Sequence, residues 1–333
     1  MAFTDIDNPE LYFQTKLYSG DGSTQSVTLD GDIDMQPDLV WLKCRSTAYH
    51  NRLFNSVSGA GKNLISDNTN AEQTVDEGVT AFNSDGFSVK QGSSLEYNAS
   101  GQTYVAWNWK ESATAGFDIV AYTGNGTAGA TVSHSLSAVP NVMIIKRRNT
   151  TDSWGTYHSS NTSAPETDVL TLNTNNATAD SNTRWNDTAP TSSVFTVGDD
   201  GGMNDNGSTY VAYLWSEKQG YSKFGSYTGN GNADGTFVYT GFKPAFVMVK
   251  RTDSTANWQI LDNKRNTYNP WNTALFPDTT DPDTTDYSTD HLSNGFKLKV
   301  TTTSRNGSGA TYIYMAFAEA PFVTSTGIPT TAR

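Results

Sequence analysis

GQTYVAWNWK at residues 101–110 decides the fold, because the same pattern returns as GSTYVAYLWS at 207–216 and as GATYIYMAFA at 309–318. In each copy large apolar side chains alternate along the segment, as they do on a strand that turns one face toward a core. We therefore predict three equivalent closing strands, each with one buried row. The three rows are Val105, Trp107 and Trp109; Val211, Tyr213 and Trp215; and Ile313, Met315 and Phe317.

Three further markers precede each closing strand, always in the same order. They are a YxGxG stretch, a proline followed by an apolar run, and a short segment of the SDGF type. The prolines Pro37, Pro140 and Pro244 lie 103 and 104 residues apart, so the chain contains an internal repeat of domain size. The markers occupy 18–22, 122–126 and 227–231; 37–45, 140–148 and 244–252; and 84–89, 192–197 and 293–298.

The markers have a simple meaning in a β-protein. The runs LVWL, VMII and FVMV suit strands that are buried on both faces. Each run is followed by a lysine (Lys43, Lys146 or Lys250), where we expect the strand to emerge into water. The YxGxG stretch is interpreted as a strand end with a tight turn, because no helical pattern and no GK[ST] sequence follow it as a phosphate loop requires.

The sequence thus predicts an all-β protein of three tandem β-sandwich domains, with jelly-roll strand order as one arrangement. Turn-forming Gly, Asn, Ser and Thr abound, and aromatic residues reach 12%. Cys44 is the single cysteine, which excludes an intramolecular disulfide. The expected organisation is an N-terminal arm at 1–14, followed by domains at 15–111, 112–218 and 219–333.

The charge balance limits the partners. Lys and Arg number 22 against 34 Asp and Glu, which gives a formal net charge of −12. Nucleic acid and anionic lipid both require a basic face, so neither is expected as a partner. The N-terminal sequence lacks the pattern of a signal peptide, and no apolar run reaches membrane-spanning length. We therefore expect no membrane insertion and no classical secretion.

The combination of YTGNG, PDLVWLK, SDGF and TYVAWNWK with the C-terminal AEAPFVTSTGIPTTAR resembles a family of repeated β-domain proteins encoded by tailed bacteriophages, especially marine ones. These are regarded as virion structural or tail-fibre-like proteins. The resemblance runs from about Tyr12 to the C-terminus, and the third unit departs from it most. It implies assembly in the host cytoplasm into a virion, with other virion proteins as partners. It supplies no catalytic residues.

The sequence carries no recognisable catalytic motif. None of the four histidines has metal-ligand spacing, and no GxSxG sequence is present, so we expect a protein that is not an enzyme. Calcium is the one cofactor that the sequence suggests. Alternating acids at Asp30, Asp32 and Asp34, or the acids of 278–286, supply suitable oxygen atoms, although ordinary turns are the simpler explanation of both clusters.

Four aromatic residues were considered as a sugar-stacking platform. Trp154 and Trp258 each follow the proline of their unit by 14 residues, which favours a structural role. Tyr268 and Trp271 have no equivalents in the other units and are therefore the predicted ligand-binding residues.

Three classes of function remain. The first is a virion structural protein, as a tail-fibre, receptor-binding or head-decoration component. The second is a carbohydrate-binding module for host surface glycans, and the third is a glycan-degrading tail enzyme. The resemblance and the missing catalytic motifs favour the first class. No long heptad or collagen-like stalk is present, which keeps a compact decoration among the alternatives.

The N-terminal segment has no counterpart before the second and third units. It carries apolar residues that a solvated tail does not need, and we expect it to lie as an arm on a neighbouring chain. A homotrimer and a single chain on a threefold position both suit this assembly. The predicted anchors are Phe3, Ile6, Leu11, Tyr12 and Phe13.

Overall fold

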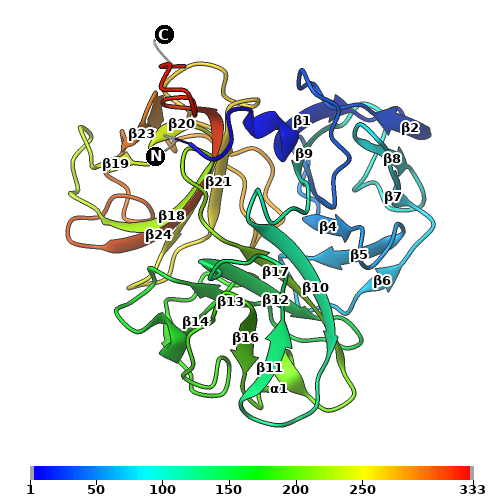
Figure 1. The fold of residues 1–333 in the computed structure, drawn as a ribbon. Coiled ribbons are helices and arrows are strands. Elements are labelled where there is room, and N and C mark those ends of the chain that lie inside the picture. Colours follow the sequence, from blue (N-terminus) through cyan, green and yellow to red (C-terminus); the bar gives the residue numbers. More distant parts are fainter. Residues whose placement is uncertain (1–3, 331–333) are drawn as a thin grey trace.

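The computed structural model describes residues 4–330, and these form six antiparallel sheets with very little helix (Figure 1). Three sheets are large and three are small, and apolar residues from one large and one small sheet pack together in each repeat. The predicted all-β sandwich fold is confirmed. Figure 1 shows the repeats as three lobes around a common centre.

The strands follow one order in all three repeats. The first repeat contains β1 (Phe13–Ser19), β2 (Thr24–Val27), β3 (Leu39–Cys44), β4 (Arg52–Asn55), β5 (Lys62–Ile65), β6 (Gln73–Thr74), β7 (Gly78–Phe82), β8 (Phe87–Lys90) and β9 (Thr103–Trp109). The second contains β10 (Phe117–Thr123), β11 (Ala130–Ser133), β12 (Val142–Arg147), β13 (Gly155–His158), β14 (Asp168–Thr171), β15 (Ala179–Asp180), β16 (Val194–Val197) and β17 (Thr209–Trp215). The third contains β18 (Ser222–Thr228), β19 (Phe237–Tyr239), β20 (Phe242–Arg251), β21 (Gln259–Asp262), β22 (Thr289–Leu292), β23 (Gly295–Leu298) and β24 (Thr311–Pro321). The helical elements are η1 (Pro9–Leu11), η2 (Pro165–Thr167) and α1 (Gly201–Asn204).

The large sheets share one topology, with the orders β1-β9-β3-β4-β5-β6, β10-β17-β12-β13-β14-β15 and β18-β24-β20-β21. The small sheets are β2-β8-β7, β11-β16 and β19-β23-β22. In each repeat the first strand therefore pairs with the last strand in the large sheet. The second strand pairs with the last but one in the small sheet, as in a strand pair that has rolled up. The middle strands of each large sheet follow one another as a meander. Within these sheets Trp107 pairs with Trp41, Tyr213 with Ile144, and Met315 with Met248.

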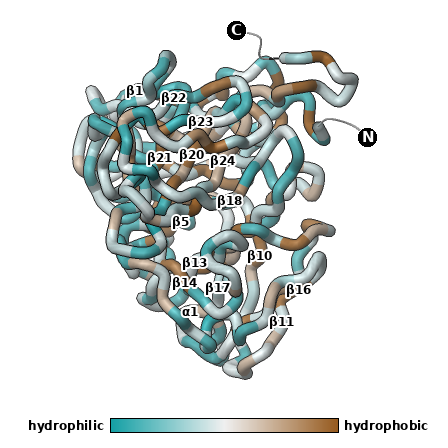
Figure 2. The backbone as a smooth tube through the Cα atoms, turned by 90° about the vertical axis from the view of Figure 1, so that its left-hand side faces the viewer, coloured by the Kyte–Doolittle hydropathy of each residue, from teal (hydrophilic) through white to brown (hydrophobic). Residues whose placement is uncertain are grey.

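Each closing strand serves two cores. The row predicted from the sequence is buried, but it does not face the interior of its own sandwich. These rows of β9, β17 and β24 meet in one apolar cluster that draws on all three repeats. The alternate side chains, such as Tyr104, Ala212 and Tyr314, pack inside the separate sandwiches. In Figure 2 the apolar segments along β20 and β24 run through the body, with hydrophilic loops around them.

Trp109 shows how the shared core joins the repeats. Its ring centroid lies 6.2 Å from that of Trp215 in the second repeat, and 5.6 Å from those of Phe246 and Phe317 in the third. Phe13, on the neighbouring strand β1, stacks on Phe317 at 5.2 Å. Because the large aromatic rings interlock across the repeats, the core is complete only when all three have come together.

The three seams between repeats are built alike. At each seam a main-chain N–H of one repeat donates to a carbonyl oxygen of the next. Such a bond joins the first repeat to the second, the second to the third and the third to the first. The repeats therefore form a closed ring with pseudo-threefold symmetry. The bonds run from Glu72 to Arg148 (2.8 Å), from Thr178 to Thr252 (2.9 Å) and from Asp283 to Arg45 (2.9 Å).

Trp154 and Trp258 belong to these seams, which confirms their predicted structural role. The indole N–H of Trp154 donates to the carbonyl oxygen of Ile65 at 2.8 Å, and that of Trp258 donates to Thr171 at 3.2 Å. Asn51 takes the equivalent place at the third seam, where its side-chain amide donates to the carbonyl oxygens of Phe276 and Thr279, both at 2.9 Å.

The three marker lysines are not exposed as the sequence suggested, for each is completely buried. The reason is that a loop of the neighbouring repeat covers the strand end and offers carbonyl oxygens to the ammonium group. Burial lowers the pKa of each lysine to about 8. Lys43 donates to Thr280 at 2.8 Å, Lys146 to Thr69 at 3.1 Å, and Lys250 to Asn175 at 3.3 Å.

The expected N-terminal arm instead packs on its own chain. Ile6 and Phe13 are 4% and 2% exposed and belong to the shared core, because their apolar side chains close its end. Tyr12 packs edge-on against Tyr221, with ring centroids 6.1 Å apart. Leu11 is 37% exposed, and Phe3 lies outside the described residues.

We expect Trp109→Ala to destabilise the whole body and not the first repeat alone. Truncating a buried tryptophan costs about 3–5 kcal/mol, and this one contacts all three repeats. Denaturant unfolding followed by far-UV circular dichroism and by limited proteolysis should show a single transition at a lower midpoint. Leu95→Ala, at a side chain that is 51% exposed, should leave the midpoint unchanged. Separate transitions for different repeats would contradict the shared core.

The buried lysines predict that stability rises with pH between about 8 and 9.5. In this window the unfolded chain keeps its lysines protonated, whereas the folded chain, with lowered lysine pKa values, releases protons. Below pH 8 the buried lysines are charged and destabilise the folded state. As the pH increases above 8 they lose their protons, and the folded state becomes more stable. Each lysine should contribute on the order of 1 kcal/mol over this range. In denaturant titrations Lys146→Met should have a smaller pH dependence than the unmodified chain, and an equal slope would contradict this origin.

Candidate ligand-binding pocket

The third repeat departs from the other two by longer strands. β20 has 10 residues and β24 has 11, against six for β3 and seven for β9. The added length pairs Phe242 with Pro321 and Lys243 with Ala320, and the register shifts on both sides of Pro244. Proline has no N–H for the ladder, and a bulge of this kind re-aims the neighbouring side chains.

A second departure lies in the chain after β21. In the first two repeats residues 56–61 and 159–167 lead from β4 to β5 and from β13 to β14, whereas in the third residues 263–274 lead from β21 to the bridge that Leu275 forms with Ile260. In the third the chain makes an excursion that returns through isolated bridges, from Trp271 to Thr289 and from Leu275 to Ile260. This excursion faces the extended ends of β20 and β24.

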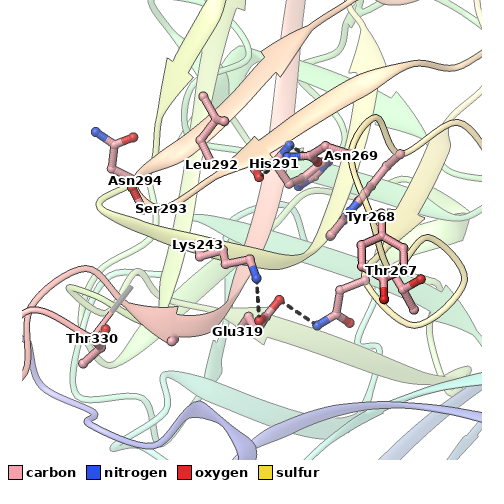
Figure 3. A pocket seen from close by; sticks show the side chains of 13 residues that line it. Lys243, Thr267, Tyr268, Asn269, His291, Leu292, Ser293, Asn294, Glu319 and Thr330 are labelled. Atoms are coloured by element: carbon pink, nitrogen blue, oxygen red, sulfur yellow. Dashed lines mark hydrogen bonds and ion pairs between the residues drawn. The ribbon is translucent and has the colours of Figure 1, made fainter. Parts of the chain in front are cut away.

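A pocket of about 680 Å³ opens between the excursion, the β22–β23 turn and the strand extensions (Figure 3). Small-molecule sites in proteins have volumes of about 300–1,000 Å³, so this pocket has room for a ligand of several rings. Its lining residues are Lys243, Asn263, Thr267, Tyr268, Asn269, Trp271, His291, Leu292, Ser293, Asn294, Glu319, Ala320 and Thr330.

The structure brings Tyr268 and Trp271 into this one pocket, where they occupy different places. Tyr268 is 85% exposed and stands at the rim. Trp271 is 3% exposed, and its ring stacks on the imidazole of His291 with a centroid distance of 3.3 Å. A ligand role for both residues stays a prediction, and Trp271, covered by His291, leaves very little of its ring open to a ligand.

Charged and amide groups form the opposite wall. The Lys243 ammonium donates to Glu319 Oε1 at 2.7 Å, and the Asn263 amide donates to Glu319 Oε2 at 3.1 Å (Figure 3). Both members of the ion pair are about one third exposed, so they remain within reach of a ligand. Because the charges balance, this wall offers hydrogen bonds without a net charge.

The sequence gives no signal for His291, because its spacing from the other histidines matches no metal-ligand pattern. Its main chain is held by Asn269, whose side chain exchanges two hydrogen bonds of 2.8 Å with it. Its two ring nitrogens are buried and have no hydrogen-bond partner within residues 4–330, and the same is true of Asn263 Oδ1. Burial, with the charges of Arg305 and Lys243, lowers the pKa of His291 well below its usual value, so the ring is neutral.

The acidic clusters serve the fold instead. Asp30, Asp32 and Asp34 do not converge, since Asp30 forms an ion pair with Lys16. Among the described residues no group of three or more His, Cys, Asp or Glu side chains is arranged to hold a metal ion, and a calcium site at these aspartates stays a prediction.

The second acidic cluster is similarly engaged. Asp278 accepts a hydrogen bond from the main-chain N–H of the seam residue Trp258 at 3.1 Å. Asp283 is paired with Arg45 at 2.9 Å and with Arg265 at 3.0 Å. These acids therefore stabilise the contacts of the third repeat.

We expect His291→Phe to leave the thermal midpoint unchanged or higher. A buried polar group without a partner costs about 1–3 kcal/mol, and a phenyl ring keeps the stacking on Trp271. Trp271→Ala is the matched comparison in the same stack, and it should lower the midpoint because it leaves a cavity. Thermal unfolding followed by circular dichroism measures both. A marked loss of stability in His291→Phe would show that the imidazole has a structural role.

Residues 8–321 match the model of the family described as Domain of unknown function (DUF7483). The comparison with curated proteins found no match. The described part of the chain contains no helix long and apolar enough to cross a membrane. The family match extends from before β1 to the last residue of β24 and thus spans all three repeats. Since it covers most of the chain, this protein belongs to the DUF7483 family.

Proposed function

We propose that the chain is a non-enzymatic structural protein of a bacteriophage particle and acts at the particle surface as a receptor-binding or decoration component. The observation that carries this proposal is a rigid, closed body of three equivalent repeats in which the third alone carries the extended strands and the excursion that form the pocket. Function is commonly placed on variable segments that a rigid scaffold holds in position. The resemblance of the repeated markers to phage proteins supports the phage setting.

The ring of seams supports a pseudo-trimer built from one chain. The contacts that one-repeat subunits would make between molecules are made here within a single molecule. Such a body suits a threefold position or a tip without forming a homotrimer. The proposed partners are other virion proteins, and assembly takes place in the host cytoplasm.

Binding is a better explanation of the pocket than hydrolysis. Glycoside hydrolases use two carboxyl groups on either side of the scissile bond, about 5–10 Å apart. Among the described residues that line this pocket Glu319 is the single acid, and Lys243 and Asn263 already bind it. The same geometry supports the carbohydrate-binding alternative, in which recognition of a host glycan is part of the virion role.

Quantitative mass spectrometry of purified particles tests the location. We expect the chain at a fixed copy number in particles banded by density, at a constant ratio to the major capsid protein. A chain that stays in the lysate and is missing from the banded particles would contradict the proposal. Deleting residues 1–14 does not test assembly, because it removes Ile6 and Phe13 from the shared core.

Incubation of the purified chain with host envelope polysaccharide tests the absence of catalysis. No reducing sugar should be released, because the pocket provides no second carboxyl group among its described lining residues. Release of reducing sugar that disappears in Glu319→Gln would overturn this part of the proposal.

A further inference from the structure

We propose that the pocket of the third repeat binds a neutral, hydroxyl-rich saccharide. Tyr268 covers the apolar face of a sugar ring, while Glu319, Asn263 and His291 contact its hydroxyl groups. This inference deepens the receptor-binding role proposed above and rests on it only for its biological setting.

The rim of the pocket provides the apolar contact. Tyr268 is 85% exposed, and Leu292, on the opposite side of the opening in Figure 3, is 37% exposed. A single exposed aromatic ring is ordinary on a protein surface. Here it stands over a concave site, where a ligand can bury it. Tyrosine suits this place because its ring binds an apolar face and its hydroxyl group stays in water.

Two of the side chains that line the pocket carry buried atoms without a hydrogen-bond partner in the described chain. A neutral imidazole has one N–H donor and one nitrogen acceptor, and neither has a partner within the described chain. Asn263 Oδ1 adds a second acceptor of the same kind. Because these atoms are buried, a ligand reaches them when the lining side chains shift, and hydroxyl groups, which both donate and accept, then satisfy all three.

The charges define the class of saccharide. Lys243 and Glu319 neutralise each other at 2.7 Å, and the whole chain has a formal net charge of −12. An acidic saccharide would be repelled by the protein and would meet no unpaired cation among the described lining residues. A neutral ligand can instead accept from Lys243 and donate to Glu319 while the ion pair remains.

Other features of the third repeat support a site that has been built for a ligand. The Lys243–Glu319 wall lies on strand extensions that the first two repeats lack, beside the bulge at Pro244. The excursion that carries Tyr268 and Trp271 is likewise longer than the connections at 56–61 and 159–167 in the first two repeats. The departures from the repeat therefore converge on one place.

The test uses the full purified chain on an array of neutral and acidic glycans. We expect binding to neutral glycans, with Tyr268→Ala reducing the affinity about tenfold for a glycan taken from the array. Tyr239→Ala is the matched control, since Tyr239 is also an exposed tyrosine of the third repeat, at 60%, but does not line this pocket. Both variants should keep the thermal midpoint of the unmodified chain. Binding to no glycan, binding to acidic glycans alone, or equal binding by Tyr268→Ala would overturn the proposal.

His291→Phe gives a second, independent readout by titration calorimetry with the same glycan. The affinity should fall about tenfold, because the hydrogen bonds of the ring are lost, while the folded state keeps its stability. Unchanged affinity in this variant would exclude His291 from the site. A chain that binds glycans but is missing from particles would contradict the virion role alone. A chain found in particles that binds no glycan would contradict the pocket assignment alone.

Discussion

The shared apolar core at the centre of the three repeats is the interaction on which the rest of the structure depends. Each closing strand has two faces, and both are buried, one inside its sandwich and one against the other repeats. Trp109 makes this dependence visible, since its neighbours come from every repeat. A single repeat would leave a row of large side chains in water, so the chain is stable as a triplet and the family match correspondingly spans all three.

Polar seams surround this core and fix how the repeats meet. An apolar surface alone allows sliding, whereas Lys43, Lys146 and Lys250 must each find carbonyl oxygens in one position. Burying an ammonium group is unfavourable, and its lowered pKa reflects that cost. We infer that the lysines mainly fix the position of each repeat against the next, and contribute less to the free energy of folding.

The sequence was informative wherever a feature repeats or breaks the repeat. Alternation in GQTYVAWNWK predicted the buried rows, and Tyr268 and Trp271, which have no equivalents in the other units, both line the pocket of the third repeat. Hydrophobic periodicity says which face of a strand is apolar, but it does not say what covers that face. For this reason the burial of Lys43 and of Phe13 was not foreseen, because the covering residues are remote in sequence. His291 was missed since an unpartnered imidazole is a property of packing.

The position of the pocket follows from the constraint of the core. Phe246 and Phe317 are paired residues of the third repeat that contribute to the shared cluster, and the strand extensions continue beyond them. Added length and a bulge at Pro244 therefore change the surface without moving the core. The same change inside the rows of β9 or β17 would displace side chains that contact other repeats. Divergence is thus tolerated at strand ends and in excursions, and in this chain the Lys243–Glu319 wall, Tyr268 and His291 lie there.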